Sequence, residues 1–430
     1  MSFNTISVIG LGYIGLPTAA MFASCKKNVI GVDVNQHAVD TINRGEIHIV
    51  EPDLDMIVHA AVTEGYLKAT TVPEPADAFL IAVPTPFKST LNKESDSEIP
   101  EPDLSYIKKA SEAIAPVLKK GDLVILESTS PVGATEKMAV WLAAARPDLT
   151  FPGPESSYSD TNIDVNVAHC PERVLPGHVV RELVENDRVI GGITAKCSAR
   201  SVELYKTFVQ GECVITNART AEMAKLTENS CRDVQIAFAN ELSIICDKLD
   251  IDVWELISLA NRHPRINILQ PGPGVGGHCI AVDPWFIISG QPNEAKLIHQ
   301  ARLVNDSKPA WVVNKVKHAI ADFLLLNPNK SVSDITIACY GLAFKADIDD
   351  LRESPAMQIV GEISKLNVGS VLAVEPNLKG LVEVISGVTM TSLSSAHSNA
   401  NIHVLLVEHS QFIEADKPAG IIIDTKGIYK

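Results

Sequence analysis

Short apolar runs alternate with amphipathic stretches along the first half of the chain. The apolar runs predict buried strands at 6–9, 29–32, 79–83, 123–126 and 188–190. The amphipathic stretches predict helices such as 37–43 and 134–145, while 151–166, rich in Pro, Ser, Asp and Asn, is expected to be a surface loop. Strands that alternate with helices are typical of βαβ units, which build a parallel sheet. The N-terminal part is therefore predicted to be an α/β domain.

A long helix and a second alternating region follow. Residues 218–249 contain neither Gly nor Pro, which predicts one helix roughly 48 Å long. Residues 261–284 are rich in Pro and Gly and are expected to form a loop, and helical patterns return at 294–326. Further strands are predicted at 335–340, 371–374, 404–407 and 421–423. The pattern predicts two α/β lobes joined by a helical middle.

The composition narrows the class of protein. Hydrophobic residues make up 46% of the 430 residues and charged residues 21%, as in ordinary globular proteins. The formal net charge of −15 argues against nucleic-acid binding, which depends on cations that neutralise phosphates. A local cluster of Arg or Lys can still bind a small anion in a cleft.

Neither a membrane span nor a secretion signal is expected. No run of about 18 apolar residues occurs, and no Lys or Arg precedes Lys26, so the basic segment of a signal peptide is missing. The eight cysteines include no C-x-x-C pair, which argues against a zinc ribbon or a dithiol motif. A cytoplasmic protein with reduced thiols is predicted.

A glycine-rich turn follows the first predicted strand as GLGYIG, residues 10–15. In a dinucleotide-binding turn Gly10 allows the tight bend, Gly12 lets a pyrophosphate approach the backbone, and Gly15 lets the helix pack closely. Asp33 ends the next predicted strand at the spacing of an acid that binds the adenosine ribose. An acid there repels a 2′-phosphate, which favours NAD over NADP.

Two threonines follow later predicted strands, where ligands of such folds bind. They are Thr85 in AVPTP and Thr129 in ESTSPVG. Each hydroxyl could instead only cap a helix.

Cys279 lies in GVGGHCIAVDP, residues 274–284, behind Gly276 and Gly277. The glycines let a bulky ligand approach the sulfur, so Cys279 is a candidate nucleophile. A free thiol in a structural loop is the alternative that this segment leaves open.

Polar residues form a stripe on the predicted long helix. Lys225, Asn229 and Arg232 are spaced by four and three residues and share one face. A cation, an amide and a second cation could stabilise an oxyanion and bind a phosphate, although a solvated stripe is the commoner case. Three further segments carry basic residues: CPERVLPG, NRHPR and GLAFKADIDDLRESP. They favour an anionic ligand over ordinary salt bridges.

Together these motifs resemble the UDP-glucose/GDP-mannose dehydrogenase family over nearly the whole chain. The resemblance implies an N-terminal Rossmann NAD-binding domain (1–200), a central helical and dimerisation domain with a long connecting helix (201–308), and a C-terminal Rossmann-like UDP-binding domain (309–430). CPERVLPG and GPGVGGHCI resemble the branch that acts on UDP-N-acetylhexosamines, and Ala281 and Val282 stand where the UDP-glucose branch often has Pro and Lys.

The resemblance also implies a reaction. A homodimer without a metal would oxidise UDP-N-acetyl-D-mannosamine to UDP-N-acetyl-D-mannosaminuronate and release two NADH, for polysaccharides such as enterobacterial common antigen. UDP-N-acetylglucosamine stays open as the substrate, because the two sugars differ at one stereocentre.

Roles carry over to the residues that match the family motifs. Cys279 resembles the nucleophile, Lys225 the proton donor and oxyanion stabiliser, and Asn229 the second oxyanion donor. Asp283 and Thr129 resemble the groups that position Lys225 and a water, and Glu172 the acid/base of thioester hydrolysis. The implied NAD contacts are Gly10, Gly12, Tyr13, Ile14, Gly15, Asp33, Thr85, Thr129 and Arg352. The implied nucleotide-sugar contacts are Arg173, Val174, Lys225, Asn229, Arg232, His263, Arg265, Gly276, Phe344 and Lys345.

Two other functions remain open at this point. A two-electron dehydrogenase of the hydroxyacid type also uses a Lys and an Asn on a long helix, but it has no role for Cys279. A catalytically silent NAD-binding protein would not need Lys225, Asn229, Cys279 and Asp283 together.

Overall fold

A computed structural model describes residues 3–49, 51–88, 99–175, 177–277, 279–378 and 385–429. The chain forms two compact units: Met1–Glu228 with Trp285–Gln291, and Asn229–Pro284 with Pro292–Lys430. Two helices, α8 (Ala218–Leu249) and α10 (Asp283–Gly290), contribute residues to both units. The bounds of α8 confirm the long helix that the absence of Gly and Pro predicts.

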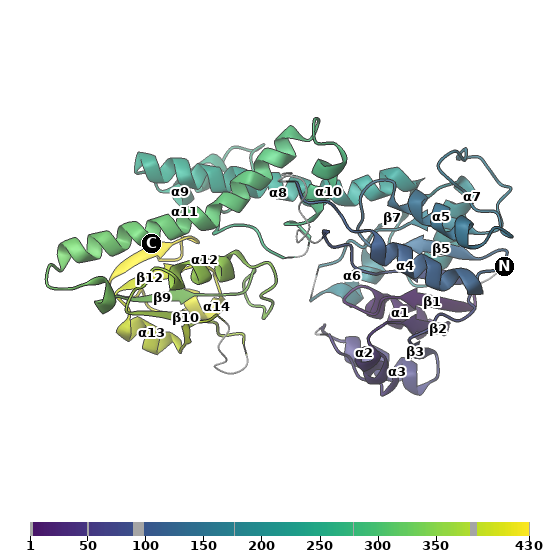
Figure 1. The fold of residues 1–430 in the computed structure, drawn as a ribbon, viewed down its shortest axis with the longest axis horizontal. Helices are drawn as coiled ribbons and strands as arrows, with labels where there is room; N and C mark the ends of the chain where they lie inside the picture. Colours follow the sequence, from purple (N-terminus) through teal and green to yellow (C-terminus); the bar gives the residue numbers. More distant parts are fainter. Residues whose placement is uncertain are drawn as a thin grey trace. The chain divides into compact units, whose positions relative to one another are not determined.

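The first unit is built on one sheet with the strand order β3-β2-β1-β4-β5-β6-β7-β8. Figure 1 shows β3, β2 and β1 as neighbours in it. The strands are β1 (Thr5–Ile9), β2 (Asn28–Val32), β3 (Leu67–Thr70), β4 (Ala78–Ile81), β5 (Leu123–Leu126), β6 (Asn166–His169), β7 (Arg188–Gly192) and β8 (Cys213–Asn217). The helices are α1 (Gly15–Ser24), α2 (Gln36–Asn43), α3 (Leu54–Thr63), α4 (Ser105–Ile114), α5 (Ala134–Ala145), α6 (Val179–Glu185), α7 (Ala195–Tyr205) and the 3₁₀ turn η2 (Ala115–Val117). Strands β1 to β6 run parallel in the order of a Rossmann fold. The prediction of an N-terminal Rossmann domain is confirmed.

The apolar pattern predicts β1, β2, β4, β5 and β7 and misses β3, β6 and β8. Their apolar runs are short, because a polar residue interrupts β3 and polar residues stand at the ends of β6 and β8. The predicted parallel sheet is confirmed for β1 to β6, and β7 then pairs with β6 in the antiparallel direction. Local patterns predict which residues are buried, but not the direction in which a strand pairs.

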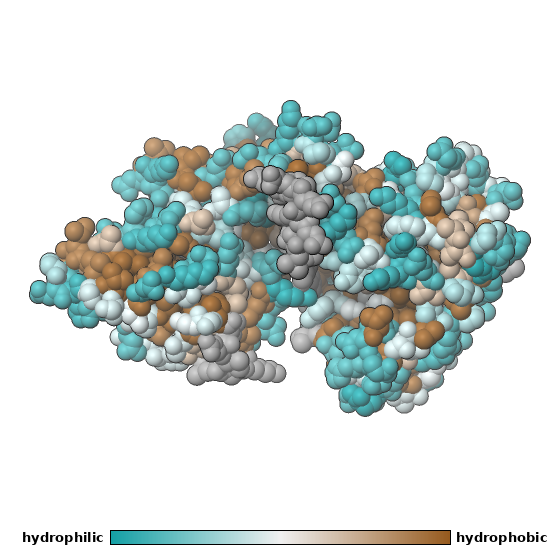
Figure 2. All heavy atoms as spheres, viewed as in Figure 1, coloured by the Kyte–Doolittle hydropathy of each residue, from teal (hydrophilic) through white to brown (hydrophobic). Residues whose placement is uncertain are grey.

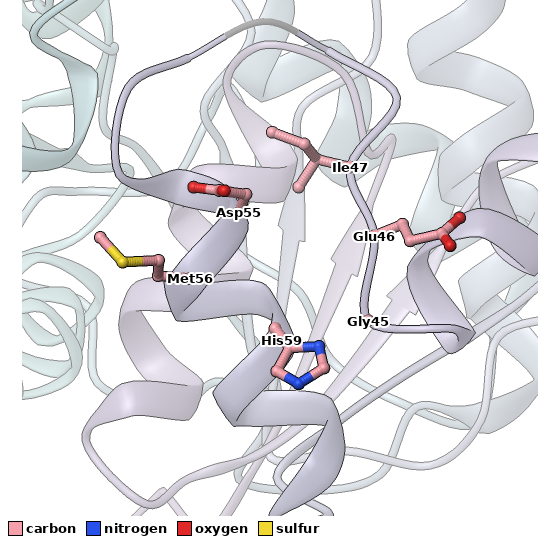
Figure 3. Close-up of a pocket in the computed structure, with 6 residues that line it drawn as sticks. All are labelled: Gly45, Glu46, Ile47, Asp55, Met56 and His59. Carbon is pink, nitrogen blue, oxygen red and sulfur yellow. The ribbon is translucent and has the colours of Figure 1, made fainter.

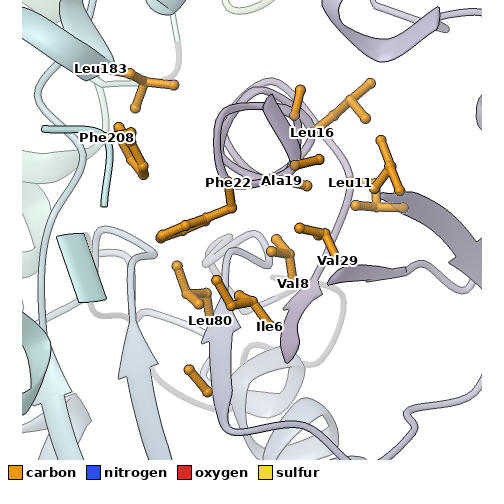
Figure 4. Close-up of a cluster of buried hydrophobic side chains, with 14 of the residues drawn as sticks. Ile6, Val8, Leu11, Leu16, Ala19, Phe22, Val29, Leu80, Leu183 and Phe208 are labelled. Carbon is orange, nitrogen blue, oxygen red and sulfur yellow. The ribbon is translucent and has the colours of Figure 1, made fainter. Parts of the chain in front are cut away.

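Both faces of this sheet are covered, so successive strand residues are buried on opposite sides. In Figure 4, Ile6, Val8 and Leu80 of the sheet lie below Phe22 of α1. The ring of Phe22 meets that of Phe208 edge to face, with centroids 4.8 Å apart. These contacts place α1, and with it the glycine turn at its start, against the centre of the sheet.

The second unit contains a five-stranded parallel sheet in the order β11-β10-β9-β12-β13. Its strands are β9 (Thr336–Tyr340), β10 (Ser370–Val374), β11 (Thr389–Met390), β12 (Ile402–Leu405) and β13 (Ile421–Asp424). Its helices are α9 (Val253–Ala260), α11 (Lys296–Leu326), α12 (Pro355–Ser364), α13 (Leu393–Asn399), α14 (Ser410–Ile413) and the 3₁₀ turn η3 (Val332–Asp334). The four predicted strands and the C-terminal Rossmann-like fold are confirmed, and only the two-residue β11 is missed.

The predicted domain boundaries at 200 and 308 stay a prediction. Within the described ranges, no helix is long and apolar enough to cross a membrane.

The two sheets repeat one arrangement around their first strand. In the first, Gly10 follows β1 and its N–H donates to the carbonyl of Val32 at the end of β2, at 2.8 Å. In the second, Gly341 follows β9 and donates in the same way to Val374 at the end of β10, at 2.9 Å. The residue after the second strand is an acid in both, Asp33 and Glu375.

A buried polar layer joins α8 to α11 inside the second unit. Arg302 donates to the Asp233 carboxylate at 2.6 Å, and Asn305 donates to the same carboxylate at 2.8 Å. Further along, the ammonium of Lys308 donates to the Ser243 hydroxyl at 2.7 Å and lies over the Trp311 ring. The Lys308 side chain is 2% exposed, so its charge is largely removed from water.

The buried Lys308 makes the stability of the second unit depend on pH. Burial lowers its pKa to about 7 in the folded chain, against about 10.4 in an unfolded one. Between these values the unfolded chain binds more protons, so stability rises with pH across this window and the penalty is complete below it. We expect Lys308→Met to raise the melting temperature most at about pH 6.5, with a gain that shrinks towards about pH 10.

Melting curves followed by circular dichroism across this pH range test the prediction. Lys317→Met, at an exposed position of the same helix, is the control and should show no such trend. A gain for Lys308→Met that is equal at every pH would contradict it.

Candidate functional site

The glycine turn after β1 has the geometry of a pyrophosphate-binding turn. Gly10 has a φ of +92°, which a side chain would strain. A Cβ on Gly15 would lie 1.8 Å from the Gly10 carbonyl oxygen, so the first turn of α1 can pack there only as glycine. A Cβ on Gly12 would meet no atom within 4 Å. The space beside Gly12 is therefore open, as the sequence motif predicts for the residue that a pyrophosphate approaches.

Asp33 directly follows β2, and Thr85 comes shortly after β4. These two strands are the neighbours of β1, which leads into the glycine turn. The Asp33 carboxylate accepts hydrogen bonds from the Leu11 N–H at 2.8 Å and the Asn35 N–H at 2.9 Å, and it keeps lone pairs for a ribose diol. In the described part of the chain, the Thr85 hydroxyl is buried without a hydrogen-bond partner. A buried unsatisfied hydroxyl is costly, so Thr85 fits a ligand contact. The turn, the acid and the hydroxyl together fit NAD.

The loop that carries Thr129 is attached to α8 by a buried carboxylate. Glu222, 1% exposed, accepts from the N–H groups of Gly133 at 2.6 Å and Thr135 at 2.8 Å, at the start of α5. Burial raises the pKa of Glu222, and these hydrogen bonds oppose that rise. Lys225 lies three residues further along α8, and its expected place beside Thr129 stays a prediction. No sequence motif pointed to Glu222.

Glu172 is held inside the first unit by Arg188 of β7. The Arg188 guanidinium donates to Glu172 at 2.9 Å and lies 3.8 Å from Glu127. Tyr205 donates to Glu127 at 2.5 Å, and burial raises the pKa of Glu127 to about 7. Glu172 is 7% exposed, and the Arg173 N–H binds its other oxygen at 2.7 Å. Arg188 and the Arg173 N–H therefore hold both carboxylate oxygens of Glu172, whose catalytic role stays a prediction.

Arg173 links the segment after β6 to α8. It forms an ion pair with Glu228 at 2.7 Å and donates to the carbonyl oxygen of Asp187. Glu228 directly precedes Asn229 on the helix. The neighbouring Val174 packs against the apolar core of the first unit. The substrate contacts expected of Arg173 and Val174 stay predictions.

In the second unit, Cys279, Asp283 and Asn229 come together around the start of α10. The Asp283 N–H donates to the Cys279 carbonyl at 2.8 Å, which forms one turn from the cysteine into the helix. The Asn229 amide donates to the Asp283 carboxylate at 2.5 Å. Asp283 is buried, whereas Cys279 is exposed. This arrangement favours an accessible thiol beside an oriented amide.

The Cys279 loop lies against Phe344, in the turn that follows β9. Gly277 has a φ of +83°, and a Cβ there would lie 3.0 Å from the Phe344 ring. A Cβ on Gly276 would lie 2.5 Å from the Glu353 carbonyl oxygen and 2.8 Å from the Cβ of Phe344. Only glycine fits at both places, so the two glycines let the cysteine loop pack directly on the Phe344 turn.

Two residues that the sequence motifs missed hold this turn. Glu375 accepts from the N–H groups of Leu342 at 2.7 Å and Ala343 at 3.0 Å, and His409 binds the same Glu375 oxygen at 3.0 Å. Burial alone would raise the pKa of Glu375, but His409 and the two N–H groups hold it below its usual value. The strand-end position of Glu375, equivalent to that of Asp33, is the signal that could have identified it.

The other predicted contacts lie on the surface of their own units. Arg232, His263, Arg265 and Lys345 are exposed. Arg352 forms an ion pair with Asp350 at 2.6 Å. In the first unit Tyr13 is 42% exposed, and Ile14 is half-buried at the start of α1. Their roles stay predictions, as does the pairing of Lys225 with Cys279, which belong to different units.

A surface hollow lies between α2 and α3 (Figure 3). Its lining residues are Gly45, Glu46, Ile47, Asp55, Met56 and His59. None of them was predicted as a site residue, and the hollow is lined mainly by carbon. We assign no function to it.

Family models match three consecutive parts of the chain. The NAD binding domain of the UDP-glucose/GDP-mannose dehydrogenase family matches residues 4–209, its central domain 219–307, and its UDP binding domain 338–430. The chain belongs to this family. It is therefore an NAD-dependent dehydrogenase, as the motifs predicted.

Individual relatives are similar over the full length. The chain is 64% identical to a UDP-N-acetyl-D-mannosamine dehydrogenase of Yersinia pestis, with all of both chains covered. It is 61% identical to an NDP-N-acetyl-D-galactosaminuronic acid dehydrogenase of Ralstonia nicotianae, with 100% of this chain and 97% of the relative covered. Among solved structures, it is similar to a UDP-D-ManNAc dehydrogenase from Pyrococcus horikoshii, with a TM-score of 0.85, 38% identity, and 99% and 96% of the two chains covered.

The glycine turn gives a matched pair of substitutions. Gly12→Ala puts a methyl group into open space, so the protein should fold normally while NAD binding weakens roughly tenfold, the effect of about 1.4 kcal/mol. Gly15→Ala would clash with the Gly10 carbonyl and should destabilise the first unit by about 1–3 kcal/mol. Melting curves and NAD titration by calorimetry separate the two effects. Equal loss of stability in both variants would contradict the assignment.

Proposed function

We propose that the protein oxidises UDP-N-acetyl-D-mannosamine to UDP-N-acetyl-D-mannosaminuronate in two NAD-dependent steps. The observation that carries the proposal is the exposed Cys279 beside the Asp283–Asn229 pair. Full-length similarity to a UDP-N-acetyl-D-mannosamine dehydrogenase supports the choice of sugar. The product would supply polysaccharides of the enterobacterial common antigen type, and we infer a cytoplasmic enzyme.

The first oxidation converts the primary alcohol of the sugar to an aldehyde. NAD, when bound, accepts a hydride from the substrate carbon. We propose that Lys225 takes part in removing the hydroxyl proton and then stabilises the oxygen together with Asn229. One N–H of the Asn229 amide is bound to Asp283, so Asp283 fixes the amide and leaves its second N–H for the substrate.

The second oxidation needs a covalent bond to Cys279. Its thiolate adds to the aldehyde carbon and forms a thiohemiacetal, which is again a hydride donor. Loss of that second hydride to a second NAD, together with the hydroxyl proton, leaves a thioester. Water then attacks the thioester with Glu172 as general base, releases the carboxylate and regenerates the thiol. Negative charge develops on the same oxygen in each stage, so one fixed pair of donors, Lys225 and Asn229, serves all of them.

A galacto-configured sugar is the second candidate substrate. The chain is 61% identical to an NDP-N-acetyl-D-galactosaminuronic acid dehydrogenase, which makes a different uronate. UDP-N-acetylglucosamine is the third candidate. All three carry the same primary alcohol, so the proposed residues and steps would serve each of them.

The number of NADH molecules formed per sugar tests the reaction. We expect two NADH for each UDP-N-acetyl-D-mannosamine consumed, because alcohol and aldehyde are both oxidised. UDP-N-acetylgalactosamine, UDP-N-acetylglucosamine and UDP-glucose are assayed beside it by absorbance and mass spectrometry. One NADH would favour the two-electron dehydrogenase, and none from any sugar would favour a silent binding protein.

Cys279→Ser tests the covalent steps. The hydroxyl of serine ionises far less readily than a thiol and is a weaker nucleophile. Formation of the uronate should therefore fall by a factor of about 10³ or more, the scale of losing a catalytic nucleophile. Ala substitution of Cys231, another exposed thiol, is the control and should keep full activity. Acid formation by Cys279→Ser at the wild-type rate would exclude the thioester route.

We also propose that the protein is a homodimer formed through α8 and α9. Phe238, Ile245 and Leu249 of α8 share one helical face and are 50%, 45% and 62% exposed. Leu259 of α9 is also exposed, and Figure 2 shows hydrophobic surface over the segment that Figure 1 labels α9. An exposed apolar stripe of this kind is typical of an interface.

Ile245→Glu should shift the protein from dimer to monomer, because a charge would be buried in the interface. Light scattering after size-exclusion chromatography measures the mass. Val140→Glu, at a similarly exposed apolar position of α5, is the control and should leave the mass unchanged. A monomeric wild type would contradict the proposal.

A further inference from the structure

The turn that carries Phe344 and Lys345 is attached to the second sheet at both of its ends. Its first residues, Leu342 and Ala343, donate their N–H groups to Glu375. Its last residue, Asp347, donates its N–H to Nδ1 of His409 at 2.9 Å. Glu375 and His409 are themselves joined by a hydrogen bond of 3.0 Å. One connected pair of side chains therefore holds the whole turn.

The hydrogen bonds determine the tautomer of His409. The Asp347 N–H points at Nδ1, and the Asn377 amide lies 3.0 Å from the same atom. A ring nitrogen that accepts an N–H bond carries no proton, so the proton is on Nε2 and is donated to Glu375. Ser410 adds to this end of the turn, because its N–H and hydroxyl donate to the Asp347 carboxylate at 2.9 and 2.6 Å.

The equivalent position in the first sheet shows what is unusual here. Asp33 also follows the second strand and accepts an N–H bond from the glycine turn, but it is only partly buried and remains accessible to a ligand. The Glu375 and His409 side chains are both fully buried, at 0% exposure. The acid that can bind a ribose in one sheet is thus covered in the other, where it binds only protein groups.

From this geometry we propose that Glu375 and His409 are positioning residues for the nucleotide-sugar. By holding the turn 342–347, they would place Phe344 and Lys345 for the nucleotide part of the substrate. The same turn supports the Cys279 loop, since Gly276 and Gly277 pack on Phe344. The inference rests on the proposed function and on the nucleotide-sugar contacts that the family resemblance implies for Phe344 and Lys345.

The test compares two substitutions of His409 with one of another buried histidine. His409→Phe keeps an aromatic ring and removes the hydrogen bonds to Asp347, Asn377 and Glu375, whereas His409→Gln can still donate to Glu375. His403 is also fully buried in the same sheet, but it bonds to Tyr340 and the Ala419 carbonyl and not to the turn. His403→Phe is therefore the matched control for general loss of stability.

We expect His409→Phe to raise KM for UDP-N-acetyl-D-mannosamine and Kd for UDP by about tenfold, the scale of losing one or two buried hydrogen bonds. The KM for NAD should not change, and kcat should fall by less than about threefold. His409→Gln should recover part of the loss. His403→Phe should lower the melting temperature as much as His409→Phe and leave UDP binding unchanged.

Two results would overturn the inference. One is a His409→Phe enzyme with wild-type Kd for UDP, and the other is an equal loss of UDP binding in His403→Phe. Neither depends on the identity of the sugar, because UDP alone is the probe in calorimetry. A wild-type protein that binds UDP but oxidises no nucleotide-sugar would instead contradict the proposed function and leave this test in force.

Discussion

The site depends on the unbroken backbone of α8 and on the hydrogen bonds that its side chains make. Glu222 binds the start of α5, and Asn229 binds Asp283. Asp233, one turn further, binds Arg302 of α11. A continuous helix fixes the spacing of these groups, so Lys225 and Asn229 must lie next to each other on one face. A Gly or Pro within α8 would weaken the helix and make the spacing of Glu222, Lys225 and Asn229 less rigid.

The second constraint is the burial of charged side chains. Hydrogen bonds from backbone N–H groups offset the cost of burying the three carboxylates that hold loops near the predicted site. The carboxylates of Glu172, Glu222 and Glu375 are almost fully buried, and each accepts at least one backbone N–H. A buried acid without such donors would be strongly destabilising. All three lie at loops that carry predicted site residues. Other buried carboxylates hold the core of each unit together instead, as Asp233 does with Arg302 and Glu127 with Tyr205.

Much of the fold and of the candidate site was predictable from sequence because it depends on local patterns. Burial on both faces makes the central strands apolar runs, so β1, β2, β4 and β5 were recognisable. The glycine turn was recognisable because its backbone geometry requires glycine at Gly10 and Gly15. The strands β3, β6 and β8 were not recognisable, because polar residues within or at the ends of these strands shorten their apolar runs.

The sequence by itself determined the fold class, the family, the cofactor turn and the candidate residues Lys225, Asn229 and Cys279. All of these follow from residue types at short, regular spacings. Only the tertiary structure decided which distant groups hold the segments that carry predicted site residues: Glu222 at the start of α5, Arg188 beside Glu172, and Glu375 with His409 on the Phe344 turn. These partners are far apart along the chain. Apart from the strand-end position of Glu375, no local pattern marks them before the tertiary fold brings each one to its loop.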